Sequence, residues 1–120
     1  EVRSAGLTVE LSIQGERPVL DAELEASAYR IIQEGLTNSL KHTGGSGRAH
    51  VTVRYDPAAV SIEIDDERGA GVTPSLEPAH DGRGLIGMRE RVALFRGTFL
   101  AQPTPTGFQV RAELPIGEAK

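Results

Sequence analysis

A long helical pattern in the first half of the chain most strongly limits the folds open to it. Apolar side chains recur at helical spacing between residues 21 and 42, and they are Leu24, Ala28, Ile31, Ile32, Leu36 and Leu40. Residues three and four apart share one face of a helix, so the pattern predicts an amphipathic helix with a buried stripe. Asp21 is its expected N-cap, and the glycines of residues 44–47 are its expected end.

The rest of the chain is read as strands, a loop and a second helix. Alternation of apolar and polar side chains predicts strands at residues 8–13, 50–55, 60–64, 98–101 and 108–114, the last four forming two hairpins. Residues 85–95 carry a shorter helical pattern, with Gly97 as its expected stop. Residues 65–84 hold four glycines and two prolines without periodicity, which is typical of a functional lid.

Together these elements predict one α+β domain over residues 1–120. The order strand, helix, hairpin, lid, helix, hairpin favours an α/β sandwich, in which helices cover one face of a mixed, mostly antiparallel sheet.

Composition excludes several classes of function. The chain has no cysteine, so disulfides, zinc–thiolate sites and cysteine nucleophiles are ruled out. A net charge of −4 argues against a non-specific nucleic-acid binder, which would carry a basic patch. No apolar run is long enough to cross a bilayer, so a cytoplasmic domain is expected, and a membrane anchor on the parent protein stays open.

The end of the long helix carries the first candidate site. Glu34, Asn38 and Lys41 follow one another at i, i+4 and i+7, and His42 comes four residues after Asn38, so they share one helix face. Oxygen donors suit Mg²⁺ and an ammonium suits phosphate oxygens. Taken alone, the segment is more simply interpreted as a solvated polar face.

Two further candidates lie at the ends of the lid. Asp65 and Asp66 close an apolar strand, where a fixed carboxylate can accept a hydrogen bond from an amine; an ordinary acidic turn is the alternative. Residues 82–87, GRGLIG, match G-x-G-x-x-G, but no strand precedes them and no acidic residue lies about 20 positions on, which excludes a Rossmann site. Glycines before a helix still provide backbone N–H groups for phosphate, unless they only make the lid flexible.

In this order, the motifs resemble those of the ATP-binding catalytic domain of two-component sensor histidine kinases. Residues 29–42 resemble the N box, residues 65–69 the first glycine box, residues 82–92 the second glycine box, and residues 106–108 the closing Gly-Thr-x-Phe motif. The N box and the run GLIGMRERV are similar to the subfamily that pairs with LuxR/NarL-type response regulators.

The resemblance implies a fold and an activity. The fold is the Bergerat ATP-binding sandwich shared with gyrase, Hsp90 and MutL. The activity is binding of Mg-ATP and donation of the γ-phosphate to a histidine on a separate, upstream dimerisation domain, for relay to a response regulator. The fragment alone is expected to be a monomer that binds ATP and autophosphorylates little or not at all, and its parent a homodimer.

The resemblance also implies roles for single residues. Asn38 would ligate Mg²⁺, and Glu34 would polarise a water or act near the γ-phosphate. Asp65 would accept the adenine amine, with Thr106 nearby. The remaining residues would lie close to the phosphates or shape the lid and its phosphate contacts, and they are Lys41, His42, Gly69, Gly82, Gly84 and Leu85.

Two departures from the family pattern keep alternatives open. Glu67 stands where the family usually has glycine, and Pro105 replaces the glycine of the closing motif. If position 67 needs a positive φ, glutamate is strained there, and its charge would weaken nucleotide binding. A degenerate nucleotide-binding or scaffold domain is therefore one alternative. An anti-sigma-factor-type serine kinase of the same fold is another, which the second glycine box disfavours.

Overall fold

The computed structural model describes residues 2–4, 7–43, 47–68 and 83–116 of the chain. The elements in order are β1 (Val2–Ser4), β2 (Leu7–Gln14), α1 (Ala22–Thr43), β3 (Arg48–Tyr55), β4 (Ala59–Glu67), α2 (Arg83–Leu94), β5 (Thr98–Pro103) and β6 (Gly107–Pro115). Both predicted helices and all five predicted strands are confirmed. β1 is an additional strand, and its three residues are too few for an alternation to show in the sequence.

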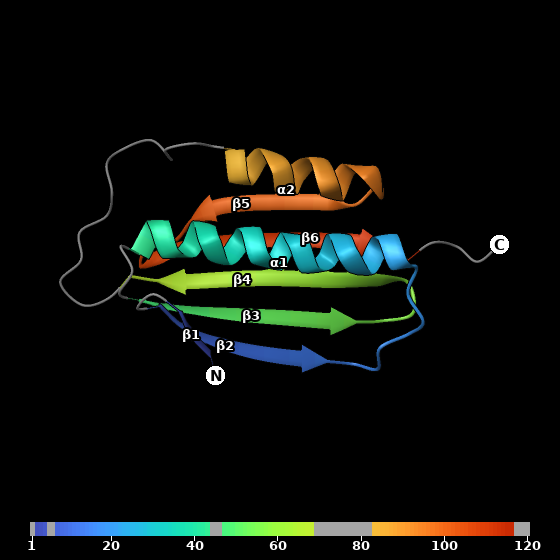
Figure 1. Ribbon diagram of the computed structural model, residues 1–120, viewed down its shortest axis with the longest axis horizontal. Coiled ribbons are helices and arrows are strands. Elements are labelled where there is room, and N and C mark those ends of the chain that lie inside the picture. Colours follow the sequence, from blue (N-terminus) through green and yellow to red (C-terminus); the bar gives the residue numbers. More distant parts are fainter. Residues whose placement is uncertain (1, 5–6, 44–46, 69–82, 117–120) are drawn as a thin grey trace.

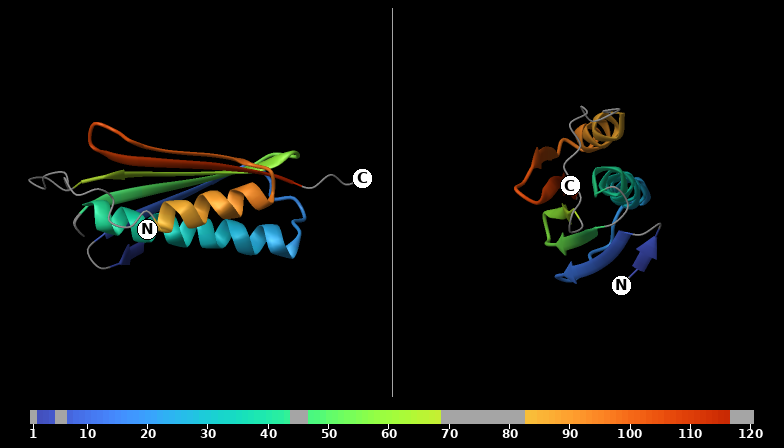
Figure 2. Two further views of the ribbon diagram at one scale, coloured as in Figure 1. Left: turned by 90° about the horizontal axis from the view of Figure 1, so that it is seen from above. Right: turned by 90° about the vertical axis from the view of Figure 1, so that its left-hand side faces the viewer.

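The strands form one six-stranded sheet in the order β1-β2-β3-β4-β6-β5. β2 and β3 pair in parallel, with α1 connecting them, and every other neighbouring pair is antiparallel. Both helices lie on the same face of this sheet (Figures 1 and 2). The predicted α+β sandwich with a mixed, mostly antiparallel sheet is therefore confirmed.

The core lies between the two helices and the sheet. Along β4, Val60, Ile62 and Ile64 are buried while the residues between them are half-buried, as the alternation predicts. Gly35 lies in the middle of α1, and a Cβ there would collide with the side chain of Ile64. This glycine of the N box therefore lets α1 approach the central strand closely.

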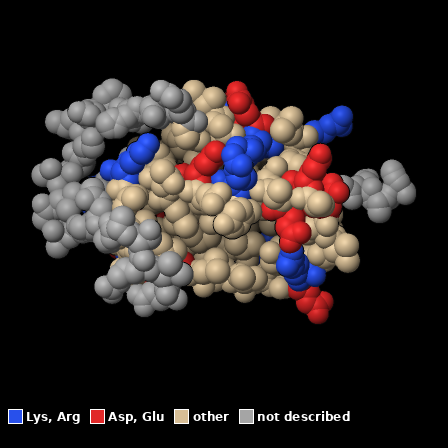
Figure 3. Space-filling model, viewed as in Figure 1, with Lys and Arg blue, Asp and Glu red and all other residues tan. Residues whose placement is uncertain are grey.

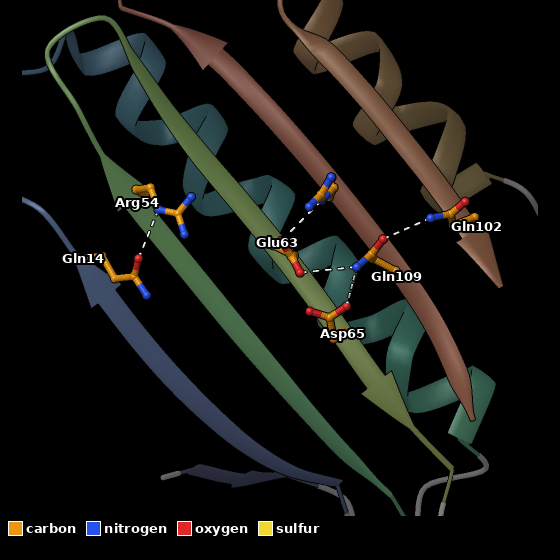
Figure 4. A network of polar contacts seen from close by, with 7 residues as sticks. Gln14, Arg54, Glu63, Asp65, Gln102 and Gln109 are labelled. Atoms are coloured by element: carbon orange, nitrogen blue, oxygen red, sulfur yellow. Dashed lines mark hydrogen bonds and ion pairs between the residues drawn. The ribbon is translucent and has the colours of Figure 1, made fainter. Parts of the chain in front are cut away.

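Neither described helix lies on the other face of the sheet, which is polar. Figure 4 shows Gln14 of β2 bonded to Arg54 of β3, at 3.0 Å, and Gln102 of β5 bonded to Gln109 of β6, at 3.1 Å. His50 lies on this face too, with its Nε2 3.1 Å from Ser12 Oγ. The face is thus a solvated ladder of cross-strand polar pairs.

The end of α2 differs in detail from the prediction. The left-handed residue is Arg96, with φ of 61°, and not Gly97. The N–H of Gly97 donates to the carbonyl of Val92 at 3.0 Å, which closes the helix. A Cβ at Gly97 would collide with the backbone carbonyl of Glu113, so this glycine is needed for close contact with β6.

Candidate functional site

The predicted motifs, far apart in sequence, converge at one end of the molecule. In Figure 1 the C-terminal ends of α1 and β4 and the start of β6 lie at the left, and the start of α2 is the end of that helix that faces the same way. Two hydrogen bonds join β4 to the β5–β6 turn here: Phe108 N–H donates to Asp66 Oδ1 at 2.9 Å, and Arg68 N–H donates to the Thr106 carbonyl at 2.9 Å. This end of the sandwich is the candidate site.

The N-box residues of α1 do not share one environment. Glu34 and Asn38 are half-buried, whereas Lys41 is exposed. Glu34 faces α2, where its Oε2 lies 3.3 Å from Nη2 of Arg91. The side chain of His42 lies outside what the structure describes. The predicted polar helix face is therefore partly enclosed at Glu34 and Asn38, and open to solvent at Lys41.

The two aspartates at the end of β4 point to opposite faces of the sheet. Asp65 lies on the open face, where its Oδ1 accepts a 2.8 Å hydrogen bond from Gln109 Nε2 (Figure 4). Asp66 is only 4% exposed and continues the inward phase of Ile64. Asp66, and not Asp65, therefore lies on the helix side with Glu34 and Asn38.

The sequence contained a signal for Asp66 that the motif comparison missed. Val60, Ile62 and Ile64 alternate inward, and the next position in that phase is 66. Gly107 pairs with the same strand end, and a Cβ there would collide with the backbone carbonyl of Asp66. Gly107, at the variable position of the closing motif, thus allows close packing against this aspartate.

The turn between β5 and β6 sets the position of Thr106. Gly107 N–H donates to Thr104 Oγ1 at 3.0 Å, and Thr104 N–H donates to the Gly107 carbonyl at 2.9 Å, which leaves Pro105 and Thr106 at the tip. Thr106 is exposed there, beside the end of β4. Pro105 fits the tip because a turn there needs no N–H donor from it.

The first turn of α2 carries the described part of the second glycine box. Gly84 has no neighbour within 4 Å of where a Cβ would be, and Leu85 is half-buried. The N–H groups of a helix's first turn have no partner within the helix, so this end can accept an anion. Gly69 and Gly82 lie outside the described residues.

The backbone strain considered for Glu67 does not arise. Glu67 is paired with Gly107 at the end of β4, and among the described residues other than glycine only Arg96 has a positive φ. The Glu67 side chain is exposed. The objection to nucleotide binding from backbone geometry at this position is therefore removed.

Metal-binding clusters and membrane-spanning helices are both absent from the described part of the chain. They contain no group of three or more His, Cys, Asp or Glu side chains arranged to hold a metal ion. No described helix combines the length and the apolar character needed to cross a membrane. The convergence of motifs at one end of the sandwich remains the candidate site.

Comparisons with known proteins establish the family of the chain. The family described as histidine kinase-, DNA gyrase B- and HSP90-like ATPases matches residues 23–118. The sensor histidine kinase LnrJ of Bacillus subtilis is 27% identical over 119 residues, covering 98% of this chain and 28% of LnrJ. The histidine-protein kinase/phosphatase UhpB of Salmonella typhimurium is 31% identical over 115 residues, covering 96% of this chain and 22% of UhpB. The chain thus spans about a quarter of the length of these relatives.

Solved structures share the fold at low sequence identity. A blue-light-activated histidine kinase of Erythrobacter litoralis superposes with a TM-score of 0.71 at 19% identity, covering 95% of this chain and 36% of that one. The histidine kinase AdeS of Acinetobacter baumannii gives 0.68 at 15% identity, covering 95% of this chain and 56% of AdeS. The chain belongs to the family of histidine kinase-, DNA gyrase B- and HSP90-like ATPases, and its fold is that of histidine kinase catalytic domains.

Proposed function

We propose that this domain binds Mg-ATP and donates the γ-phosphate to a histidine on a separate dimerisation domain of a sensor kinase. The observation that carries the proposal is that Asp66 is buried on the helix side of the sheet, which is also the side of α1, with its N-box residues Glu34 and Asn38, and of the first turn of α2. Asp66 can accept a hydrogen bond from an amine. Glu34 and Asn38 carry oxygen atoms of the kind that bind Mg²⁺, and the first turn of α2 has backbone N–H groups that can bind phosphate.

Asp66 is the residue that we propose for the adenine amine. A buried carboxylate that already accepts one backbone hydrogen bond, from Phe108, is held in a fixed orientation. Its inward phase supports it over Asp65, whose carboxylate is engaged on the opposite face. Thr106, on the adjoining turn, is the proposed neighbour of the base.

Asn38 is the residue that we propose for Mg²⁺. Its amide oxygen is a hard donor of the kind Mg²⁺ accepts, and Mg²⁺ usually needs only one or two protein ligands beside phosphates and water. The ion, when bound, would neutralise charge on the phosphates. Lys41, His42, Gly69, Gly82, Gly84 and Leu85 stay proposed phosphate and lid residues.

Positioning would account for most of the catalysis by such a site. Phosphoryl transfer needs the attacking and leaving oxygens in line, and charge on the transferred group to be neutralised. Glu34 lies one helical turn before Asn38, which puts a carboxylate beside the proposed phosphate site. We propose that it polarises the attacking group.

The wider setting of the domain follows from its relatives. LnrJ is a sensor histidine kinase, and UhpB is a signal-transduction histidine-protein kinase/phosphatase. We propose a parent kinase that is a homodimer, with an upstream histidine-bearing domain, the catalytic domain in the cytoplasm and a LuxR/NarL-type response regulator as partner. The lack of strain at Glu67 removes one of the two grounds for the degenerate-domain alternative, and the charge of this side chain is the ground that remains.

Calorimetric titration of ATP, with and without Mg²⁺, tests the proposal on the chain and two matched variants. Asp66→Asn should weaken binding about 10- to 100-fold, since a hydrogen bond to a charged group contributes about 1.5–3 kcal/mol. Asp65→Asn changes the neighbouring residue in the same way and should stay within about twofold. The reverse result would overturn the Asp66 assignment, and a parent chain that binds no ATP would overturn the proposed function.

A further inference from the structure

An ion pair joins α1 to α2. Nη2 of Arg91, in the last turn of α2, lies 3.3 Å from Oε2 of Glu34 in α1. The two side chains are only 28% and 29% exposed, so both charges are largely removed from water. On the helix face of the molecule, acidic and basic side chains meet over the two helices within a mostly uncharged surface (Figure 3).

The carboxylate of Glu34 is held at one oxygen only. Its Oε1 is buried without a hydrogen-bond partner among the described residues, and so is Nε of Arg91. Gly87 lies four residues before Arg91 and therefore on the same face of α2. A Cβ at Gly87 would lie 3.4 Å from Oε1, at the near limit of ordinary van der Waals contact. The helix thus contacts the carboxylate at Arg91 and packs closely against it at Gly87.

A purely structural ion pair does not account for this arrangement. Partly buried ion pairs add little net stability, because the loss of hydration offsets their attraction. A distance of 3.3 Å is longer than that of strong charge-assisted hydrogen bonds. Native proteins retain few buried polar atoms without partners, and those they retain call for an explanation such as a catalytic role. Here one ion pair contains two.

We propose that Arg91 is a positioning residue for Glu34. Through its contact with Oε2 it fixes the orientation of the Glu34 carboxylate relative to the group that attacks the γ-phosphate. The inference rests on the proposed function, which supplies the nucleotide. In this proposal α2 has two roles. Its start, with Gly84 and Leu85, would contact the phosphates, and Arg91 near its other end would orient Glu34.

Hydrolysis of ATP by the chain gives a reaction in which this role is measurable. The oxygen of water forms a bond to the γ-phosphorus while the bond from that phosphorus to the β,γ-bridging oxygen breaks. ADP leaves with the electron pair of that bond, and one proton of the water passes to the Glu34 carboxylate and then to solvent, while the other stays on the phosphate formed. Arg91 takes no part in these bonds and acts only through the orientation of Glu34.

The test compares three variants of the chain with the parent. The affinity for ATP is measured by calorimetry, the rate of hydrolysis with protein in excess over ATP, and folding by thermal melts. Arg91→Met should lower the hydrolysis rate about 10-fold or more, because small misplacement of a catalytic group is costly, while the Kd for ATP stays within about threefold. Arg91→Lys should recover part of the rate. Arg89→Met is the matched control, since Arg89 lies over the Phe99 ring at 5.0 Å, and it should leave rate and Kd unchanged.

Each other outcome separates this inference from the proposed function. If the parent binds ATP but Arg91→Met hydrolyses it at the parental rate, the positioning role is wrong. The positioning role is also wrong if Arg91→Met and Arg89→Met lower the rate equally. It is wrong too if the rate of Arg91→Met falls only in proportion to the fraction of that variant that is folded. A parent that binds ATP and hydrolyses none would also overturn the inference. A parent that binds no ATP would instead overturn the proposed function.

Discussion

Two acidic side chains of β4 lie close together on the face of the sheet that is opposite the helices. Glu63 and Asp65 are both on β4 and share one donor: Gln109 Nε2 lies 3.3 Å from Glu63 Oε2 and 2.8 Å from Asp65 Oδ1. Arg111 Nε lies 3.3 Å from the other oxygen of Glu63. The hydrogen bond to Asp65 raises the pKa of Glu63 above its ordinary value of 4.5, and partial burial and the charge of Asp65 act in the same direction.

The raised pKa of Glu63 predicts a pH-dependent effect of Glu63→Gln. The folded state binds this proton more tightly than the unfolded state, so its contribution to stability is present below pH 4.5 and is lost as pH rises through the folded pKa. Glutamine imitates the protonated acid at every pH. The free energy of unfolding of the variant, relative to that of the parent, should therefore rise between pH 4 and pH 7. The rise should be only about a few tenths of a kcal/mol, because the site is partly solvated.

Urea unfolding at pH 4, 5, 6 and 7 measures this difference. Glu90→Gln, on the exposed side of α2, is the control for the loss of one carboxylate. A difference between Glu63→Gln and the parent that stays constant or falls over this range would contradict the role given to Asp65.

The sequence predicted the segments that carry the candidate residues, but the direction in which a single side chain points depends on the strand and on packing. A motif comparison aligns letters, and it chose Asp65, whereas the two-residue period of a strand selects Asp66 as the inward side chain. Arg91 could not be found in this way, because its partner Glu34 lies 57 residues earlier and only the packing of α2 on α1 brings them together. Local pattern therefore predicts which side chains exist near a site, and packing decides which of them meet.

Among the elements, the end of α2 holds a residue in an unfavourable conformation. Arg96 has φ of 61°, a region in which a side chain is disfavoured by about 1–2 kcal/mol. Its N–H donates to the carbonyl of Ala93 at 2.9 Å, so the conformation is part of the helix end. The glycine that helix ends usually place at such a position comes one residue later here, at Gly97, where contact with β6 requires it.

Arg96→Gly is therefore expected to stabilise the domain. Removing the side chain relieves the strain. The greater freedom of glycine in the unfolded chain costs about 0.5–1 kcal/mol of stability, so the net increase in the free energy of unfolding should be about 0.5–1 kcal/mol. For a domain of this size the melting temperature should rise by roughly 2–4 °C. Arg96→Ala removes the same long side chain and keeps the strain, so an equal gain in the alanine variant would show that φ is not the cause.

The helices and strands could be predicted because the helical spacing and the two-residue alternation of apolar side chains are distinct in this chain. The helical stripe of α1 and the alternation of β3, β4 and β6 all appear in the burial pattern. β1 was missed, since three residues give no pattern, and its pairing with β2 depends on tertiary contact. Leu11 and Ile13 follow the inward phase of Val9 but are 58% and 60% exposed, because no helix covers that end of β2.

At the scale of the whole molecule, the two helices cover only part of the sheet. α1 packs on β3, β4 and β6, and α2 on β5 and β6, which leaves the helix side of β2 open (Figure 2). A hollow of about 310 Å³ remains there, lined by Leu7, Val9, Leu11, Ile32, Leu36, Thr37, Leu40 and Val51. Such a surface could serve self-association if it were large enough.

The size of this surface predicts a monomer. A stable interface takes about 20–30 residues from each partner, and the hollow offers eight. The edge strands offer little more, since β1 has three residues and β5 ends at Pro103, which cannot donate a ladder hydrogen bond. Light scattering of the chain at micromolar concentration should therefore give the mass of one copy, 12.8 kDa. A stable dimer would contradict this prediction. If the paired change Leu11→Gln and Ile13→Gln dissociated that dimer, the contact between the copies would be at β2. If the dimer persisted in the double variant, the contact would be at an edge of the sheet.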